Sequence, residues 1–300
     1  MLERGLDVTV VARDSPERTV SAVAGGLWLP YECGPPERVA GWAVATLREL
    51  DRLEAEEGAP IAQVEAHLIG AGGFWVAALP AGRVRAPETV PGTVSGAGRG
   101  GDGLVARLPL VQTPAYLSWL MARARAMGAF FERRAIASLE ELGGPGRVVV
   151  NCLGLAAREV AGDDRVEPVR GDVVLVRPLT GVRCVVDLSD PVELAYVLPR
   201  PDVCILGGTA VAGDEPDPGA FEAIWERCVA LEPALRDAER IGQATGLRPA
   251  RPEVRVERGT LADGTPVVHD YGHGGGGLTL SWGCADEVAD LALAAIGSVP

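Results

Sequence analysis

A glycine-rich run near the C-terminus holds the residue types best suited to chemistry. Residues 269–277 read HDYGHGGGG, with His269 and His273 four positions apart. On a helix this pair could bind a metal ion, but the surrounding glycines disfavour a helix, so the sequence predicts no metal site. Consecutive glycines instead let the backbone approach a flat or anionic ligand with its N–H groups. A tight surface loop remains the alternative, and spacing alone does not decide between the two.

A second glycine run is a literal match to a nucleotide-binding pattern. Residues 96–101 read GAGRGG and satisfy G-x-G-x-x-G. That pattern works only when a strand enters the turn and a helix leaves it, so that the helix N-terminus meets the pyrophosphate. Here Pro and Gly residues precede the run and follow it closely. We therefore interpret residues 96–101 as a flexible loop.

Composition excludes several classes of protein. The 300 residues are 47% hydrophobic and 23% charged, as in a globular chain, and no apolar run approaches the length of a membrane span. The net charge of −13 disfavours nucleic-acid binding. The first residues do not read as a secretory signal, so we expect a cytoplasmic protein. The six cysteines form no CxxC pair, and we expect neither a disulfide nor a structural zinc.

The hydrophobic pattern predicts an α/β fold. Short apolar runs predict strands at residues 8–12, 148–151, 173–176, 183–187, 196–198, 203–206, 254–257 and 267–269. Helical periodicity predicts helices at residues 37–57, 113–127, 218–231 and 286–296, with Thr113 as the cap of the second. The high content of Gly, Pro and Arg in residues 80–103 predicts loops and edge strands. The strand-rich middle of the chain predicts a second lobe.

Three separated segments together resemble one enzyme family. Residues 267–285 (VVHDYGHGGGGLTLSWGCA), 245–257 (TGLRPARPEVRVE) and 23–31 (VAGGLWLPY) are similar in order and spacing to the D-amino-acid oxidase family of flavoproteins. The resemblance implies a Rossmann-like FAD-binding lobe, formed by residues 1–32, 112–155 and 262–300. It also implies a mixed-sheet substrate lobe, formed by residues 33–111 and 156–261.

The resemblance implies oxidation of neutral D-amino acids. A hydride would pass from the substrate Cα to flavin N5, and the products would be a 2-oxo acid, ammonia and hydrogen peroxide. The expected partners are a small-molecule D-amino acid and oxygen, without nucleic acid or membrane, and the chain could form a homodimer. Two alternatives stay open: a related flavin amine oxidase of the glycine or sarcosine type, and a cofactor-free remnant that only binds a ligand or partner.

The resemblance also assigns roles to single residues. Arg255 matches the arginine that binds the substrate carboxylate, Tyr196 a tyrosine that adds a hydrogen bond, and Gly275 a carbonyl that accepts from the amine. The alternative interpretations are a surface ion pair for Arg255 and a core position for Tyr196. The residues assigned to FAD are Arg13, Asp14, Thr19, Ser21, Gly26, Leu27, Ala135, Gly154, Gly274, Gly277, Leu278 and Thr279, with Ala135 contacting it through backbone only.

This sequence departs from the family pattern in two ways. The stretch between Asp187 and Tyr196 is short for a lid, which predicts an open pocket, and it holds no arginine, which disfavours acidic substrates unless Arg200 or Arg251 serves. The family's first strand and glycine turn are also absent. Their absence predicts two unpaired strand edges. A misplaced start codon, a truncated product, and a partner chain or self-association that covers the gap are the competing explanations.

Overall fold

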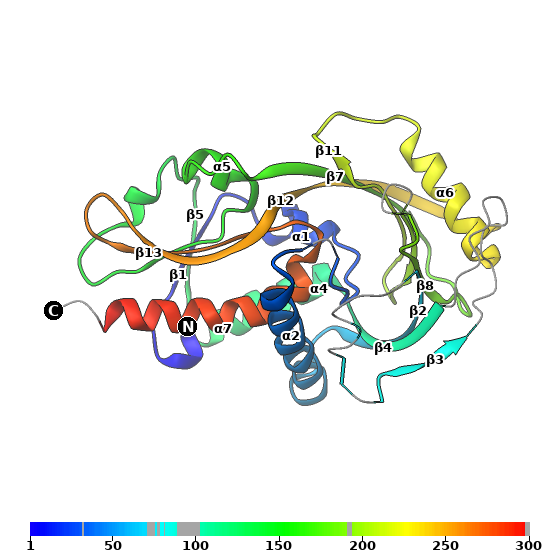
Figure 1. Ribbon diagram of the computed structural model, residues 1–300, viewed down its shortest axis with the longest axis horizontal. Coiled ribbons are helices and arrows are strands. Elements are labelled where there is room, and N and C mark those ends of the chain that lie inside the picture. The colour runs from blue at the N-terminus through cyan, green and yellow to red at the C-terminus, as the bar shows by residue number, and fades with distance from the viewer. Residues whose placement is uncertain are drawn as a thin grey trace.

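A computed structural model describes residues 1–31, 33–70, 76, 79–80, 82–88, 103–190 and 194–297. The helices are α1 (Val20–Val23), α2 (Pro36–Glu57), α4 (Thr113–Ala126), α5 (Ala157–Val160), α6 (Ala220–Leu231) and α7 (Gly277–Ile296). The strands are β1 (Thr9–Ala12), β2 (Ile61–Ile69), β3 (Val84–Glu88), β4 (Gly103–Val111), β5 (Phe130–Arg133), β6 (Val149–Asn151), β7 (Glu167–Val176), β8 (Cys184–Asp187), β9 (Ala195–Pro199), β10 (Cys204–Gly207), β11 (Val211–Ala212), β12 (Arg240–Thr260) and β13 (Pro266–His273). The fold is α/β, as the sequence predicts (Figure 1).

One large mixed sheet runs through the molecule (Figure 1). Its order is β3-β4-β2-β8-β9-β10-β7-β12-β13-β6, and β11 pairs with β7 beside this path. The 21-residue strand β12 connects the two ends, because it pairs with β7 through its first half and with β13 through its second half. β12 therefore carries residues that face different parts of the molecule.

Two of the three parallel strand pairs among the described residues lie in the segments that the resemblance assigns to the FAD-binding lobe. β1 pairs with β5, and β6 pairs with β13 at the end of the large sheet, both in parallel. Among the described residues, β1 and β6 each have a single neighbouring strand. Val10 on β1 is 37% exposed and Phe130 on β5 is 65% exposed, although such strands are normally covered on both faces. β1 and β6 therefore each have one edge without a strand partner in the part of the chain that the structure describes.

Helices α2 and α7 pack side by side below the sheet (Figure 1). The side chain of Thr46 on α2 accepts hydrogen bonds from the backbone N–H groups of Trp282 and Gly283 on α7 at 3.1 and 3.0 Å. α2 buries one apolar face that includes Leu47, Leu50 and Leu53, as its helical periodicity predicts. No helix in the described part of the chain has both the length and the apolar run that a membrane crossing requires.

Two details of the predicted helices are wrong. α7 begins at Gly277, nine residues before the predicted start, because the segment after the glycine run packs against α2 rather than forming a strand. Thr113 is the first residue of α4 and not its cap. Its hydroxyl donates instead to the backbone carbonyls of Ala22 and Ala24 at 3.2 and 3.1 Å, which fastens α1 to α4. The glycine run at residues 96–101 lies outside the described residues.

Candidate active site

Arg248 lies on β12, in the half of this strand that pairs antiparallel with β7. Its Nη1 donates to the carbonyl of Thr209 at 2.8 Å, and its guanidinium lies flat against the backbone of Gly171 on β7. A Cβ at position 171 would lie 2.2 Å from Arg248 Nη2, so only glycine leaves room for this arginine. A guanidinium carries five N–H donors, so the bond to Thr209 leaves donors for a ligand carboxylate.

Tyr196 on β9 lies beside Arg248. Burial raises the pKa of the Tyr196 hydroxyl, and the positive charge of Arg248 and a hydrogen bond from it oppose that rise. The ring lies over Gly207, which is its register partner on β10, and a Cβ there would lie 1.9 Å from the ring. The hydroxyl is therefore protonated at neutral pH and is positioned next to a cation.

Gly275 reaches the same place from the end of β13. A Cβ built on Gly275 would lie 3.8 Å from Arg248 Cδ and 3.2 Å from Tyr31 Cδ1. Gly275 itself is exposed, so its backbone is open to a ligand on this side. Four distant parts of the sequence thus meet here, contributing a cation, a phenol, an aromatic ring and exposed glycine backbone.

A buried carboxylate supports Arg248 from behind. Asp172 is fully buried and accepts hydrogen bonds from Arg170 at 2.8 Å, from Thr245 at 2.6 Å and from Thr209 at 2.9 Å. The bond from Thr245 ties β12 to β7 next to Gly171, and the bond from Thr209 holds the residue whose carbonyl accepts from Arg248. The position of the Arg248 guanidinium is therefore held by a hydrogen-bonded network rather than by packing alone.

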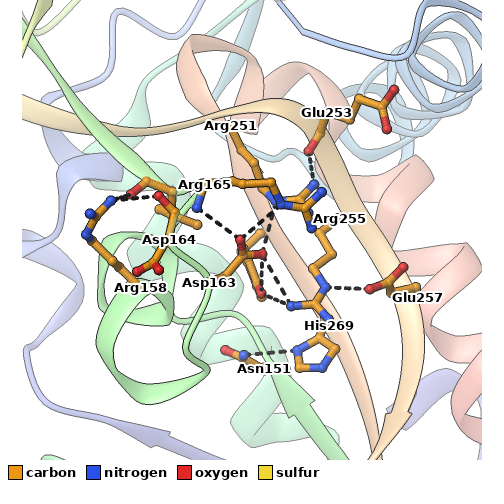
Figure 2. A network of polar contacts seen from close by, with 12 residues as sticks. Asn151, Arg158, Asp163, Asp164, Arg165, Arg251, Glu253, Arg255, Glu257 and His269 are labelled. Atoms are coloured by element: carbon orange, nitrogen blue, oxygen red, sulfur yellow. Dashed lines mark hydrogen bonds and ion pairs between the residues drawn. The ribbon is translucent and has the colours of Figure 1, made fainter.

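Arg255 lies elsewhere, in the network of Figure 2. Its Nε donates to Glu257 at 2.6 Å, and its Nη1 lies 3.3 Å from Asp163 and also bonds the Tyr271 hydroxyl. The resemblance predicts that Arg255 lies with Tyr196 and Gly275 at the substrate. In the structure the contacts of Arg255 lie instead in the network around Asp163. The ion-pair interpretation of Arg255, the alternative that the sequence leaves open, describes these contacts.

The register of β12 explains this outcome. Ala250 pairs with His273 and Arg255 with Tyr271, so the four residues 251–254 of β12 lie opposite the single residue Gly272 of β13. Arg248 and Arg255 are seven positions apart, an odd number, which in a strand directs side chains to opposite faces. The irregular register between them also bends the strand. Arg248 is the residue that sequence reasoning missed. It lies in the same TGLRP segment that carries the resemblance, but only the register distinguishes it from the arginines that follow.

Asp163 is the centre of the network in Figure 2. Its carboxylate lies 3.1 Å from Arg251 and 3.3 Å from Arg255, and accepts from the Tyr271 hydroxyl at 3.0 Å. Burial raises the pKa of Asp163, but hydrogen bonds from Tyr271 and Arg165 outweigh it and hold the pKa below the usual carboxyl value. The network fastens the segment after α5 to β12 and β13.

The other predicted cofactor residues mostly follow the parallel strands. Arg13 and Asp14 come directly after β1 and form an ion pair at 2.7 Å, with Arg13 74% exposed. Ala135 lies just beyond β5 and is exposed, and Gly154 lies beyond β6 against Pro249. In sheets of this type, ligands bind at the carboxyl ends of parallel strands. These residues are therefore placed where a dinucleotide can be contacted.

A hydrogen bond beyond β6 holds its carboxyl end in place. The Asn151 side chain bonds the ring of His269 at 3.2 Å, while its carbonyl oxygen accepts from the backbone N–H of Leu153. Burial, together with the charge of Arg255, lowers the pKa of His269. His269 is thus a neutral structural residue, and the turn that leads to Gly154 is fixed by it.

The residues predicted to contact the flavin ring lie around the start of α7. Thr279 accepts from the backbone N–H of Leu29 at 3.1 Å and donates to its carbonyl at 3.0 Å, which joins α7 to the segment after Gly26 and Leu27. The first turn of α7, with Gly277 and Leu278, has no side-chain cap. Its N–H groups can therefore meet ligand oxygens, helped by the positive end of the helix dipole.

Thr19 and Ser21 lie at the short helix α1. Thr19 is the N-cap residue of α1, and its hydroxyl donates to the carbonyl of Pro16 at 2.6 Å. Ser21 is exposed. Val20 and Val23 of the same helix face Gly246 of β12, close to the Arg248 site. α1 therefore carries the predicted cofactor residue Ser21 and contacts β12 two residues before Arg248.

Gly26 has no room for a side chain. Its replacement tests whether the chain at Gly26 and Leu27 must keep its conformation for the protein to bind flavin. Its φ is +94°, and a Cβ would lie 2.0 Å from the carbonyl oxygen of Val111. We expect Gly26→Ala to destabilise the chain by about 1–3 kcal/mol and to weaken flavin retention. Gly41→Ala, in the exposed interior of α2 with open space around it, should instead stabilise by about 0.5–1 kcal/mol. Thermal melts and flavin content check both. Equal effects of the two variants would contradict the expectation.

A surface hollow lies away from this site. It has a volume of about 290 Å³ and is lined by Glu3, Glu49, Arg52, Arg123, Trp282 and Asp286. Its charged side chains are mostly paired with each other, as in the contacts of Arg123 with Glu3 and of Arg52 with Glu49. None of the residues predicted for substrate or cofactor lines it. The convergence around Arg248 is therefore the better candidate for chemistry.

Comparisons with known proteins identify a family, relatives and a fold to which this chain is similar. A family model described as FAD dependent oxidoreductase matches residues 1–291. The chain is 46% identical to a D-amino-acid oxidase of Rubrobacter xylanophilus, covering 98% of this chain and 91% of that one. It is 43% identical to a D-amino-acid oxidase of Streptomyces coelicolor, covering 97% and 91%. A glycine oxidase from Bacillus cereus has a similar fold, with a TM-score of 0.75 at 18% identity over 98% of this chain and 90% of that one.

Proposed function

The chain belongs to the family of FAD-dependent oxidoreductases, and on this premise we propose that it oxidises neutral D-amino acids. The products would be 2-oxo acids, ammonia and hydrogen peroxide. The two D-amino-acid oxidases that are 46% and 43% identical over nearly the whole chain support this substrate class. Glycine oxidase shares the fold at 18% identity, which supports no choice of substrate.

The meeting of Arg248, Tyr196 and Gly275 is the observation that carries the proposal. We propose that Arg248 binds the substrate carboxylate and that the Tyr196 hydroxyl adds a second hydrogen bond to it. The exposed backbone of Gly275 would accept from the substrate amine. These contacts hold an amino acid at both of its charged groups, and the side chain is left to the rest of the pocket. Arg255 has no part in this arrangement.

The residues around the start of α7 fit FAD. The uncapped N–H groups at Gly277 and Leu278 suit the ring's carbonyl oxygens, and Gly26 leaves no side chain in the way. Arg13, Asp14 and Gly154 would contact the remainder of the dinucleotide. Bound FAD would supply the redox chemistry by accepting a hydride at N5 and passing electrons to oxygen. The division into a flavin lobe and a substrate lobe stays a prediction, as do a homodimer and a cytoplasmic location.

The preference for neutral side chains rests on how the nearby arginines are engaged. Arg200 is bound through both Nε and Nη2 to Asp202, at 3.0 and 2.7 Å, and its Nη1 bonds Thr113 at 2.9 Å. Arg251 is 5% exposed and is paired with Asp163. Both cations that could have received an acidic substrate already have carboxylate partners. We therefore expect D-alanine or D-valine to be oxidised faster than D-aspartate.

A spectroscopic experiment tests the proposal. The purified chain is incubated with FAD, excess FAD is removed, and the visible spectrum is recorded before and after anaerobic addition of D-alanine. We expect flavin absorption that is bleached by the substrate, and peroxide release once oxygen is admitted. A chain that retains flavin but is bleached by sarcosine or glycine and not by D-alanine would refute the substrate class. A colourless chain would favour the cofactor-free alternative.

Tyr196→Phe tests the second carboxylate contact. The change removes one hydroxyl and keeps the ring over Gly207, so we expect a loss of about 1 kcal/mol, or roughly fivefold in kcat/KM. The loss should appear in KM more than in kcat, because the bond is to the substrate carboxylate and not to the reacting atoms. Steady-state kinetics with D-alanine measure it. An unchanged KM would remove Tyr196 from the substrate contacts.

A further inference from the structure

Asp270, His273 and Cys284 bring three different donor groups together in a place that the proposed oxidation does not use. One atom from each, a carboxylate oxygen, an imidazole nitrogen and a thiol sulfur, lies within 4.8 Å of the other two. Asp270 and His273 lie at the end of β13, and Cys284 lies on α7, which packs beside that strand (Figure 1). The glycine turn that precedes α7 connects the two sides.

The contact between Asp270 and His273 is close but is not a hydrogen bond. Oδ1 of Asp270 lies 3.1 Å from Nε2 of His273, and both side chains are only 16% exposed. The same Oδ1 is buried and accepts no hydrogen bond from the described residues. Two ligands of one tetrahedral ion, at bonds of about 2.0–2.1 Å, lie about 3.3 Å apart. The geometry resembles a pair of ligands that share a cation.

We propose that Asp270 Oδ1, His273 Nε2 and Cys284 Sγ bind a zinc-type divalent transition-metal ion that joins the end of β13 to α7. A thiolate and an imidazole with one carboxylate suit Zn²⁺ and its spectroscopic substitute Co²⁺ better than Mg²⁺ or Ca²⁺. Cys152 offers a further donor beside the group, with its Sγ 4.0 Å from Asp270 Oδ2.

This site differs from the histidine pair that the sequence suggests. His269 has its Nδ1 3.2 Å from the Asn151 side chain and is not a member of the group. The other two ligands are instead Asp270 and Cys284, and Cys284 lies on α7, eleven residues after His273. Spacing on one helix does not reveal this combination. An ion here would join residues that precede and follow the turn at residues 274–276.

Thiolate binding must release a proton. When the metal–sulfur bond to Cys284 forms, the S–H bond breaks and its proton passes to the solvent. No electron is transferred, and no oxidant is needed.

Cobalt titration of the full-length chain tests the proposal. We expect tetrahedral Co²⁺ bands to the red of flavin absorption together with a sulfur-to-metal charge-transfer band, saturating at one ion per chain and displaced by Zn²⁺. Cys284→Ser should abolish the charge-transfer band, and His273→Asn should weaken Co²⁺ binding tenfold or more. Cys184→Ala removes an equally buried thiol from β8 and should leave the titration unchanged.

Two outcomes would overturn the site. One is the absence of Co²⁺ bands and of stoichiometric zinc in the parent chain, and the other is an unchanged charge-transfer band in Cys284→Ser. If Cys284→Ser does not fold, His273→Asn still decides, because this side chain is only partly buried and asparagine keeps a polar group there. Zn²⁺ should also raise the melting temperature of the parent chain and of Cys184→Ala, but not of His273→Asn. None of these readouts depends on turnover, so failure here leaves the proposed oxidase activity standing.

Discussion

Arg248→Ala is expected to lower kcat/KM for D-alanine by at least about 30-fold, corresponding to about 2 kcal/mol or more. The guanidinium lies beside Tyr196 and Gly275 and is held in place through Thr209 and Gly171. Its loss leaves the substrate carboxylate without a cationic partner in a partly buried site. Steady-state kinetics and substrate titration of the flavin spectrum measure the effect, which should appear mainly as weaker binding.

Arg255→Ala is the matched control. This arginine bonds Glu257, Asp163 and Tyr271, so its removal should lower the melting temperature and leave kcat/KM of the folded enzyme within about threefold. Arg248→Lys adds a second comparison, because an ammonium retains the charge but cannot form two parallel bonds to a carboxylate. If Arg255→Ala lost substrate binding while Arg248→Ala retained it, the assignment would return to Arg255.

Asp163→Asn is expected to lower the free energy of unfolding by about 3 kcal/mol. Asp163 is the carboxylate between two arginines, at 3.1 Å from Arg251 and 3.3 Å from Arg255, and it is 5% exposed. Removing its charge takes away the carboxylate that pairs with the buried Arg251, which lies close to a second cation, Arg255, while Arg255 keeps Glu257. Urea unfolding of the folded chain measures the change. Asp164→Asn alters an exposed neighbour and should change stability by no more than about 0.5 kcal/mol.

The same carboxylate predicts a pH dependence. The pKa of Asp163 is lower in the folded chain than its ordinary value of 3.8. A group of this kind stabilises the fold at pH values above its unfolded pKa, and the contribution is lost as the pH falls through the folded pKa. The stability difference between the parent chain and Asp163→Asn should therefore be constant near neutral pH and shrink below about pH 3.8. A difference that persisted at lower pH would contradict the role of the charge.

The sequence predicts most of the local structure because local patterns determine it. The apolar periodicity of α2 predicts residues 37–57, and the helix spans Pro36–Glu57. The short β-branched runs predict β6, β8 and β10 to within one residue at either end. The strand β12 is longer than predicted, since only residues 254–257 have a regular strand pattern. Gly246, Pro249 and Pro252 weaken the pattern before them, but pairing with β7 and β13 overrides this local preference.

The residue types of the site were also determined by the sequence. The segments that carry the resemblance are sufficient to identify Tyr196, Gly275 and the glycine turn before α7. In the structure Tyr196 and Gly275 both lie beside Arg248. The identity of that arginine could not be read from the segment, because residues 248, 251 and 255 are all arginines within eight positions. Spacing alone does not show which of them faces Tyr196.

Only the tertiary structure decided among these three arginines. The irregular register of β12 against β13 turns Arg251 and Arg255 toward Asp163, a residue 88 and 92 positions away from them. Pairing with β7 places Arg248 over Gly171. Likewise, Asp270, His273 and Cys284 become one group only where α7 packs beside β13. A sequence determines which donors a chain carries. The strand register and the helix packing determine which of them meet, because these arise from contacts distant along the chain.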